Sequence, residues 1–204
     1  MRLALLALIA AAVALSCNPS TRVVASWKDP TVGDLVLERP LVVFQHPSEA
    51  LRRSVEDAIA ERIPGAVPAY EVIATDEIFD VEGVQEKVRR AGFDTVMIMR
   101  LVDIKAQIDL LPGEPRPSYD PLWGAWTGGW TQVDNPEYLD TINVVTLESL
   151  VYALEPGLDG ELVWAGRSET FDPSSFESLA RSVARSSVKK MAKDGVIVAA
   201  IDPE

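Results

Sequence analysis

The stretch of residues 95–109 constrains the fold more than any other part of the chain. Residues 95–101 are apolar on both faces of an extended strand, whereas residues 102–109 alternate between apolar and polar side chains. A strand that is apolar on both faces is covered on both sides of its sheet, and an alternating one is covered on one side. The segment therefore predicts a long strand that is central at its start and half-covered at its end.

Four further apolar runs, bounded by proline and glycine, predict additional strands. The predicted strands are residues 41–45, 67–74, 95–109, 141–154 and 161–170. Pro68 favours an edge position or a late start for the second of them, because proline cannot donate a hydrogen bond to a neighbouring strand.

Three segments with helical spacing of apolar residues begin at capping side chains. The predicted helices follow Ser48, Asp80 and Ser174 and stop at Pro64-Gly65, Gly92 and Gly195. Ser174 and Glu177 are spaced as a capping box.

The order of these elements is β-α-β-α-β-β-β-α. Interleaved helices followed by an antiparallel meander predict a mixed sheet with helices packed on it, an α/β (α+β) fold. We expect residues 40–204 to form a single domain. Residues 17–39 contain Pro19, Pro30 and Gly33 and are interpreted as a tether, within which residues 22–27 are suited to a short strand.

The first sixteen residues have the pattern of a secretory signal peptide. A basic start at Met1-Arg2 is followed by an unbroken apolar run at residues 3–13 and by small residues before Cys17. The apolar run is shorter than the roughly 20 residues that a membrane-spanning helix needs. We therefore predict that residues 1–16 are removed.

The sequence Ala14-Leu15-Ser16-Cys17 resembles the lipobox of bacterial lipoprotein precursors. It matches at Ser16 and Cys17 and departs by having Leu in the middle and Ala where Leu is commonest. The resemblance implies that Cys17 is lipidated and anchors the chain to a membrane; the alternative is an ordinary signal with an incidental cysteine. Asn18 in place of the Asp that retains lipoproteins in the inner membrane implies the periplasmic side of the outer membrane in a Gram-negative cell.

Composition excludes several classes of function. With 19 Lys and Arg against 31 Asp and Glu, the formal charge of −12 argues against a nucleic-acid partner. The single cysteine excludes an intrachain disulfide, and the single histidine, His46, excludes a His-rich metal site. Because the sequence also lacks the glycine-rich, nucleophile-elbow and zinc-protease motifs, we expect no enzyme activity, no metal and no cofactor. A hydrolase using paired carboxylates is the weakest remaining alternative.

The segment of residues 112–140 is unusually rich in proline, glycine and aromatic residues for a connection between two strands. Its large aromatic residues are Tyr119, Trp123, Trp126, Trp130 and Tyr138. Tryptophan is favoured at binding hot spots and stacks on flat ligand faces, which makes this segment a candidate binding loop. The alternatives are that the loop buries its aromatic residues over the sheet, or that it lies at a membrane interface near the anchor.

Arg100 and Glu148 fall on apolar faces of their predicted strands. A buried charge is costly without a partner, so we expect these two side chains to form a structural ion pair across adjacent strands.

Two short motifs resemble a family of small bacterial envelope lipoproteins of uncharacterised function. They are the sequence SWKDP at residues 26–30 and the sequence LVWAGRSET at residues 162–170. The resemblance implies a non-enzymatic binding or assembly factor with an envelope protein as partner. The alternative is a module that binds glycan or peptidoglycan through the Trp-rich loop.

Overall fold

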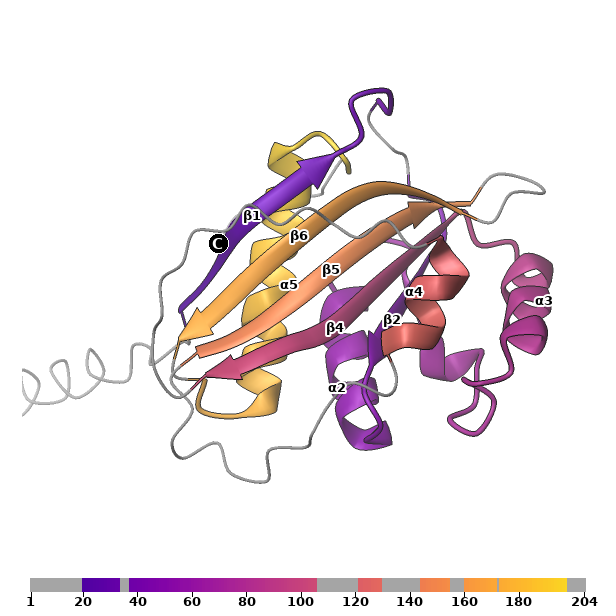
Figure 1. The fold of residues 1–204 in the computed structure, drawn as a ribbon, viewed down its shortest axis with the longest axis horizontal. Helices are drawn as coiled ribbons and strands as arrows, with labels where there is room; N and C mark the ends of the chain where they lie inside the picture. The colour runs from indigo at the N-terminus through magenta and orange to yellow at the C-terminus, as the bar shows by residue number, and fades with distance from the viewer. Residues whose placement is uncertain are drawn as a thin grey trace, which may run out of the picture.

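The chain folds around a single mixed sheet, shown in Figure 1. The computed structural model describes residues 20–33, 37–105, 121–129, 144–154, 160–171 and 173–197. The predicted signal peptide, Cys17 and residues 112–120 and 130–140 of the Trp-rich segment lie outside these ranges.

Six strands in the described ranges form the sheet, in the order β1-β6-β5-β4-β2-β3. They are β1 (Ser20–Lys28), β2 (Pro40–Gln45), β3 (Val67–Pro68), β4 (Thr95–Lys105), β5 (Val144–Ala153) and β6 (Glu161–Phe171). β2 is parallel to both β3 and β4, whereas β4, β5, β6 and β1 pair antiparallel. This is the mixed sheet with packed helices that the sequence predicts.

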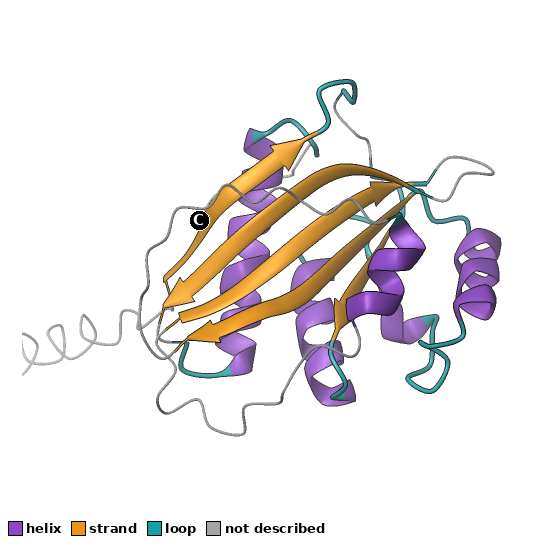
Figure 2. Cartoon of the chain, in the orientation of Figure 1, coloured by secondary structure: helices purple, strands orange, loops and turns teal. Residues whose placement is uncertain are grey.

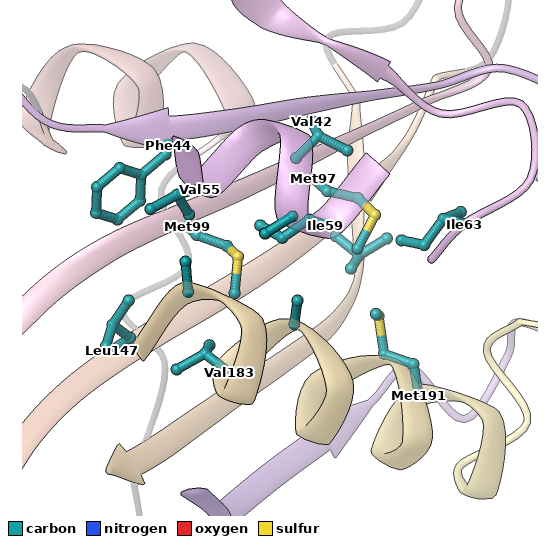
Figure 3. Packing of buried hydrophobic residues seen from close by; sticks show 14 of the residues in the cluster. Val42, Phe44, Val55, Ile59, Ile63, Met97, Met99, Leu147, Val183 and Met191 are labelled. Carbon is teal, nitrogen blue, oxygen red and sulfur yellow. The ribbon is translucent and has the colours of Figure 1, made fainter. Parts of the chain in front are cut away.

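Helices cover both faces of the sheet, as Figure 2 shows. The helical elements are α2 (Glu49–Ala60), the 3₁₀ turn η1 (Ala69–Glu71), α3 (Val81–Ala91), α4 (Leu122–Gly129) and α5 (Phe176–Lys193). α2 and α5 pack on one face, where Figure 3 shows Ile59 and Val183 meeting Met99 of β4. η1, α3 and α4 pack on the other face. The two-sided cover explains why β4 begins as an apolar run, since its residues face helices in both directions.

Local capping chemistry sets where the helices begin. The Ser48 hydroxyl accepts a hydrogen bond from Leu51 N, and the Asp80 carboxylate accepts one from Gly83 N at 3.1 Å, which confirms both predicted caps. The predicted box of Ser174 and Glu177 is wrong by one residue. Ser175 caps α5 and exchanges hydrogen bonds with Ser178, because the Ser178 hydroxyl takes the part expected of the glutamate.

The predicted strand at residues 67–74 is much shorter in the structure. β3 holds two residues and is followed at once by η1. Pro68 has no N–H to donate, and the Tyr70 N–H bonds to the Glu56 carboxylate at 2.9 Å and not to a neighbouring strand. The backbone therefore leaves the sheet after Pro68.

A β-bulge changes the second half of β4. The register with β5 shifts between Leu101 and Asp103, so the alternation expected for residues 102–109 is broken at its first position. Val102, predicted to point inward, is 43% exposed. A bulge places two residues opposite one on the partner strand and turns the extra side chain away.

β1 occupies much of the segment that the sequence assigns to a tether. All of Ser20–Lys28 is strand, paired along its length with β6 at the edge of the sheet. The end of β1 is held by the Lys28 ammonium, which donates to the Gly195 carbonyl at 2.6 Å. Much of the tether expected at residues 17–39 is therefore a strand of the domain, and this strand contains the short strand expected at residues 22–27.

The second motif that carries the family resemblance packs against the same end of α5. Trp164 is fully buried, lies over Gly166, and donates its indole N–H to the Asp194 carboxylate at 2.9 Å. Burial alone would raise the pKa of Asp194, but hydrogen bonds from Lys190, Trp164 and Ser26 hold that pKa below its usual value. The two motifs thus meet around Asp194 and join the first strand to the last helix.

Candidate functional site

The centre of the Trp-rich segment is helical. Leu122–Gly129 form α4, whose first turn begins with the Gly124 and Ala125 N–H groups bonded to the Pro121 carbonyl. Leu122 lies against Gly160 in the β5–β6 connection, where an added Cβ would lie 2.9 Å from the Leu122 side chain. This part of the segment is therefore packed on the sheet.

Trp126 lies in the core and not at a ligand-binding surface. Its side chain is 1% exposed, and its indole N–H donates to the Ile78 carbonyl at 2.8 Å. It packs with Leu122, Ala125 and the residues of the sheet face that α4 covers. The expected binding role does not fit Trp126, because its ring is enclosed by protein. At this position the segment buries its aromatic residue over the sheet, which was the alternative to a binding loop.

Gln45 at the end of β2 fixes α4 in place. The Gln45 side chain is fully buried and donates from Nε2 to the carbonyls of Ala125 and Trp126, at 2.8 and 2.7 Å. Carbonyl groups near the C-terminal end of a short helix lack hydrogen-bond donors within the helix. The Gln45 amide donates to two such carbonyls of α4. Gln45 was missed in the sequence, although a glutamine that closes a buried apolar run needs a polar partner.

Two exposed or partly exposed aromatic residues adjoin the contacts of Trp126, Trp123 through its ring and Phe79 through Ile78, and we call them the aromatic patch. Trp123 is partly exposed, with its ring centroid 6.0 Å from that of Trp126 at an angle of 55°. Phe79, which follows Ile78, is 65% exposed. Of the aromatic residues predicted to bind, Tyr119, Trp130 and Tyr138 lie outside the described residues.

The exposure of Phe79 is unusual for its position in the chain. It directly precedes the Asp80 cap of α3, where an apolar residue commonly packs on the fourth helical residue, here Val84. Val84 is 1% exposed, so that residue is covered while most of the Phe79 ring is not. Sequence reasoning missed Phe79 because it treated the cap alone and not the residue before it.

Acidic residues flank Phe79 in the sequence. Asp76, Asp80 and Glu82 are exposed, and Glu77 is half-buried. The Asp80 carboxylate holds the helix cap, and Glu77 pairs with Lys87 at 2.5 Å, which keeps the pKa of Glu77 below its usual value. Over residues 76–82 the chain therefore carries four acids and no base, and we call these four side chains the acidic rim.

A hollow of about 500 Å³ lies next to the acidic rim. It is lined by Glu49, Arg53, Tyr70, Ala74, Thr75 and Asp76. The Arg53 guanidinium pairs with Glu49 at 2.7 Å and lies 4.7 Å from the centre of the Tyr70 ring. The Tyr70 hydroxyl donates to Asp57, whose carboxylate raises the pKa of Tyr70 to about 12.

A buried ion pair lies behind this hollow. Arg52 and Glu56 are both fully buried, with 3.5 Å between Arg52 Nε and Glu56 Oε1. The Glu56 carboxylate also accepts from Phe44 N and Tyr70 N, at 3.0 and 2.9 Å. Burial raises the pKa of Glu56 to about 7 against these hydrogen bonds and the arginine. Sequence reasoning missed both residues, although they stand four positions apart among apolar helix residues.

His46 is buried beside this pair. It is 1% exposed, stacks on Phe44 with ring centroids 5.7 Å apart, and accepts a hydrogen bond from Ser48 N at 3.0 Å. Burial lowers the pKa of His46, so the ring is neutral at pH 7. Its contacts join the end of β2 to the start of α2, which is a structural role.

Arg100 and Glu148 lie directly opposite each other on β4 and β5. Arg100 Nη2 and Nε lie 2.6 and 2.8 Å from Glu148 Oε2. Their side chains are 26% and 11% exposed, so the pair is partly desolvated. Arg167 faces Glu148 from β6 on the other side, which places one carboxylate between two guanidinium-bearing residues.

No group of three or more His, Cys, Asp or Glu side chains in the described ranges is arranged to hold a metal ion. Among the described helices, none has the length and apolar character needed to cross a membrane.

Comparison with known proteins gives only distant likenesses. No family model matches the chain, and no curated protein matches it. Two solved structures of the PelC dodecamer from Paraburkholderia phytofirmans are similar to it. A variant in space group C2 has 14% identity and a TM-score of 0.40, over 82% of this chain and 94% of that chain. The structure in space group P6 has 12% identity and a TM-score of 0.40, over 83% and 94%. A likeness at this level leaves the function of this chain open.

Proposed function

We propose that the chain is a lipid-anchored protein of the cell envelope that acts as a non-enzymatic binding or assembly factor. In this proposal residues 1–16 are the signal peptide, Cys17 carries the lipid, and Asn18 directs the protein to the periplasmic side of the outer membrane.

The observation that carries the proposal is the position of β1 relative to Cys17. The strand begins at Ser20, three residues after the cysteine. Three extended residues span about 10 Å, so a lipid on Cys17 would hold the domain close to the bilayer surface. Ser20, Phe171, Val144 and Lys105 form one row across the sheet, which would be the end nearest the membrane.

The Phe79 end of the aromatic patch lies toward the opposite edge of the sheet from the anchored strand. β1 and β3 are the two edges of a six-stranded sheet, and β3 leads through η1 to the segment that carries Phe79. These two edge strands are five strand spacings, or about 24 Å, apart. Figure 1 shows α3 and α4 on the side of the molecule away from β1. This placement supports a binding role, because the patch would face away from the anchored edge.

Metabolic labelling tests the anchor. In cells fed an alkyne-bearing fatty acid, the wild-type protein should take up the label and fractionate with the outer membrane, and Cys17→Ser should do neither. Ser16→Ala is the matched control, because a small residue before the cysteine is kept and labelling should persist. A wild-type protein without label, or label that remains in Cys17→Ser, would overturn the proposal.

A glycan-binding module is the second candidate, and the partly exposed Trp123 is the observation that favours it. A flat aromatic face at the surface can stack on a sugar ring. Tryptophan fluorescence should then shift on titration with soluble muropeptides, and Trp123→Ala should abolish the shift. An unchanged emission spectrum at saturating muropeptide would exclude this candidate.

A further inference from the structure

We propose that the aromatic patch, the acidic rim and the neighbouring hollow form one docking surface for a segment of another envelope protein that combines apolar and basic side chains. The proposal rests on the proposed function and specifies its partner. In this proposal Phe79 and Trp123 supply most of the binding energy, and the carboxylates near them select a basic partner.

The apolar part of the surface is preformed. Trp123 is supported by the buried Trp126, which the Ile78 carbonyl and the Gln45 amide hold in place. Phe79 exposes 65% of its surface next to the capped first turn of α3. An aromatic ring held by its neighbours, as that of Trp123 is, needs little ordering on association and is a typical anchor of a protein interface.

The charge around the patch selects the partner. In the described residues, Asp76 and Glu82 have no hydrogen bond or ion pair, so their full charge is available at the surface. Glu77 is already neutralised by Lys87, and Asp80 is engaged at the cap. With a formal charge of −12 on the whole chain, the field around this surface attracts a cationic partner and repels an anionic one.

The hollow offers a place for a basic side chain. Glu49 and Asp76 contribute two carboxylates to its lining against the single guanidinium of Arg53. Arg53 is stacked on Tyr70 and paired with Glu49, so the Asp76 carboxylate is the open acceptor at its rim. A lysine or arginine can lay its apolar stem along the hollow and bring its charge to Asp76. Because Asp76 belongs to both the hollow and the acidic rim, the two features form a continuous surface.

A protein segment fits this surface better than a lipid headgroup or a neutral sugar. Phe79 lies in the segment that follows β3, and β3 is five strand spacings, or about 24 Å, from the edge strand that follows Cys17. This part of the patch therefore lies away from the anchored edge. A neutral glycan could stack on the rings but would gain nothing from the uncompensated charge of Asp76 and Glu82.

Photo-crosslinking in living cells tests the proposal on the full-length protein. Benzoylphenylalanine replaces Phe79, and the matched control carries it at Val24, which is 41% exposed on β1 at the other edge of the sheet. We expect position 79, and not position 24, to give one dominant protein adduct. Mass spectrometry should locate the crosslink in a segment that bears lysine or arginine.

The charge requirement is tested in the same strain. The double change Asp76→Asn and Glu82→Gln should lower the adduct yield about threefold, whereas Glu177→Gln, an exposed acid on α5, should leave it unchanged. A glycan adduct, equal yields at positions 79 and 24, or a yield insensitive to the double change would overturn the docking surface. Fatty-acid labelling of the same cells distinguishes the two proposals. If the protein is labelled but the crosslinking result fails, only the docking surface is contradicted; if the protein is also unlabelled, the proposed envelope function is contradicted as well.

Discussion

Replacement of Trp126 by alanine tests whether α4 is part of the core. The side chain is 1% exposed and its indole N–H bonds to the Ile78 carbonyl at 2.8 Å. Truncating a buried tryptophan costs about 3–5 kcal/mol in free energy of unfolding. Trp126→Phe keeps most of the apolar contact but leaves the buried carbonyl without its donor, at a cost of about 1–3 kcal/mol.

Urea unfolding of the mature chain with Cys17→Ser, followed by circular dichroism, provides the measurement. Trp123→Ala is the control, because this ring is partly exposed in the same helix and should cost about 1–2 kcal/mol. The expected order of destabilisation is Trp126→Ala, then Trp126→Phe and Trp123→Ala. If Trp126→Ala is no more harmful than Trp123→Ala, α4 does not pack on the sheet and our placement of the patch fails.

Three further predictions concern the sheet and α2. Arg100→Met or Glu148→Leu alone should lower the free energy of unfolding by about 1–3 kcal/mol, and the double change should cost less than either; additive losses would contradict the pairing. The pKa of Glu56 is about 7 in the folded state, against an ordinary value of 4.5. Because the folded state therefore holds this proton more tightly, the free energy of unfolding should fall by up to about 3 kcal/mol as the pH rises from 4.5 to about 7. Glu56→Gln should remove this slope, and a slope that survives in the variant refutes the assignment. Gly166→Ala would place a Cβ 2.2 Å from the Trp164 ring and should lower the melting temperature, whereas an unchanged melting temperature would show that the ring does not lie there.

The elements that could be predicted from the sequence are those whose causes are local. Ser48, Asp80 and Gly92 cap or end their helices through contacts within a few residues, so the pattern of side chains is sufficient. Strand alternation puts Arg100 and Glu148 on the apolar faces of their strands, and Arg100 precedes the β4 bulge that shifts the later register.

The remaining features depend on contacts between distant parts of the chain. Residues 22–27 are suited to a short strand by their sequence, but the partner of β1 is β6, more than a hundred residues away, and no local pattern shows that pairing. α4 exists because Gln45 and Ile78, 80 and 48 residues from their partners, hold it on the sheet. From the sequence, the tryptophans of this helix are equally suited to binding a ligand and to packing on the sheet, because nothing local shows which indole N–H bonds to a carbonyl far away in the chain.

The intact mass of the protein extracted from membranes tests the central claim most directly. Our account predicts a chain that begins at Cys17 and carries acyl groups on that residue, followed after two residues by the first strand of the domain. A chain that retains Met1, or one that is cleaved with Cys17 absent or unmodified, would contradict the anchor and the orientation of the domain that follows from it.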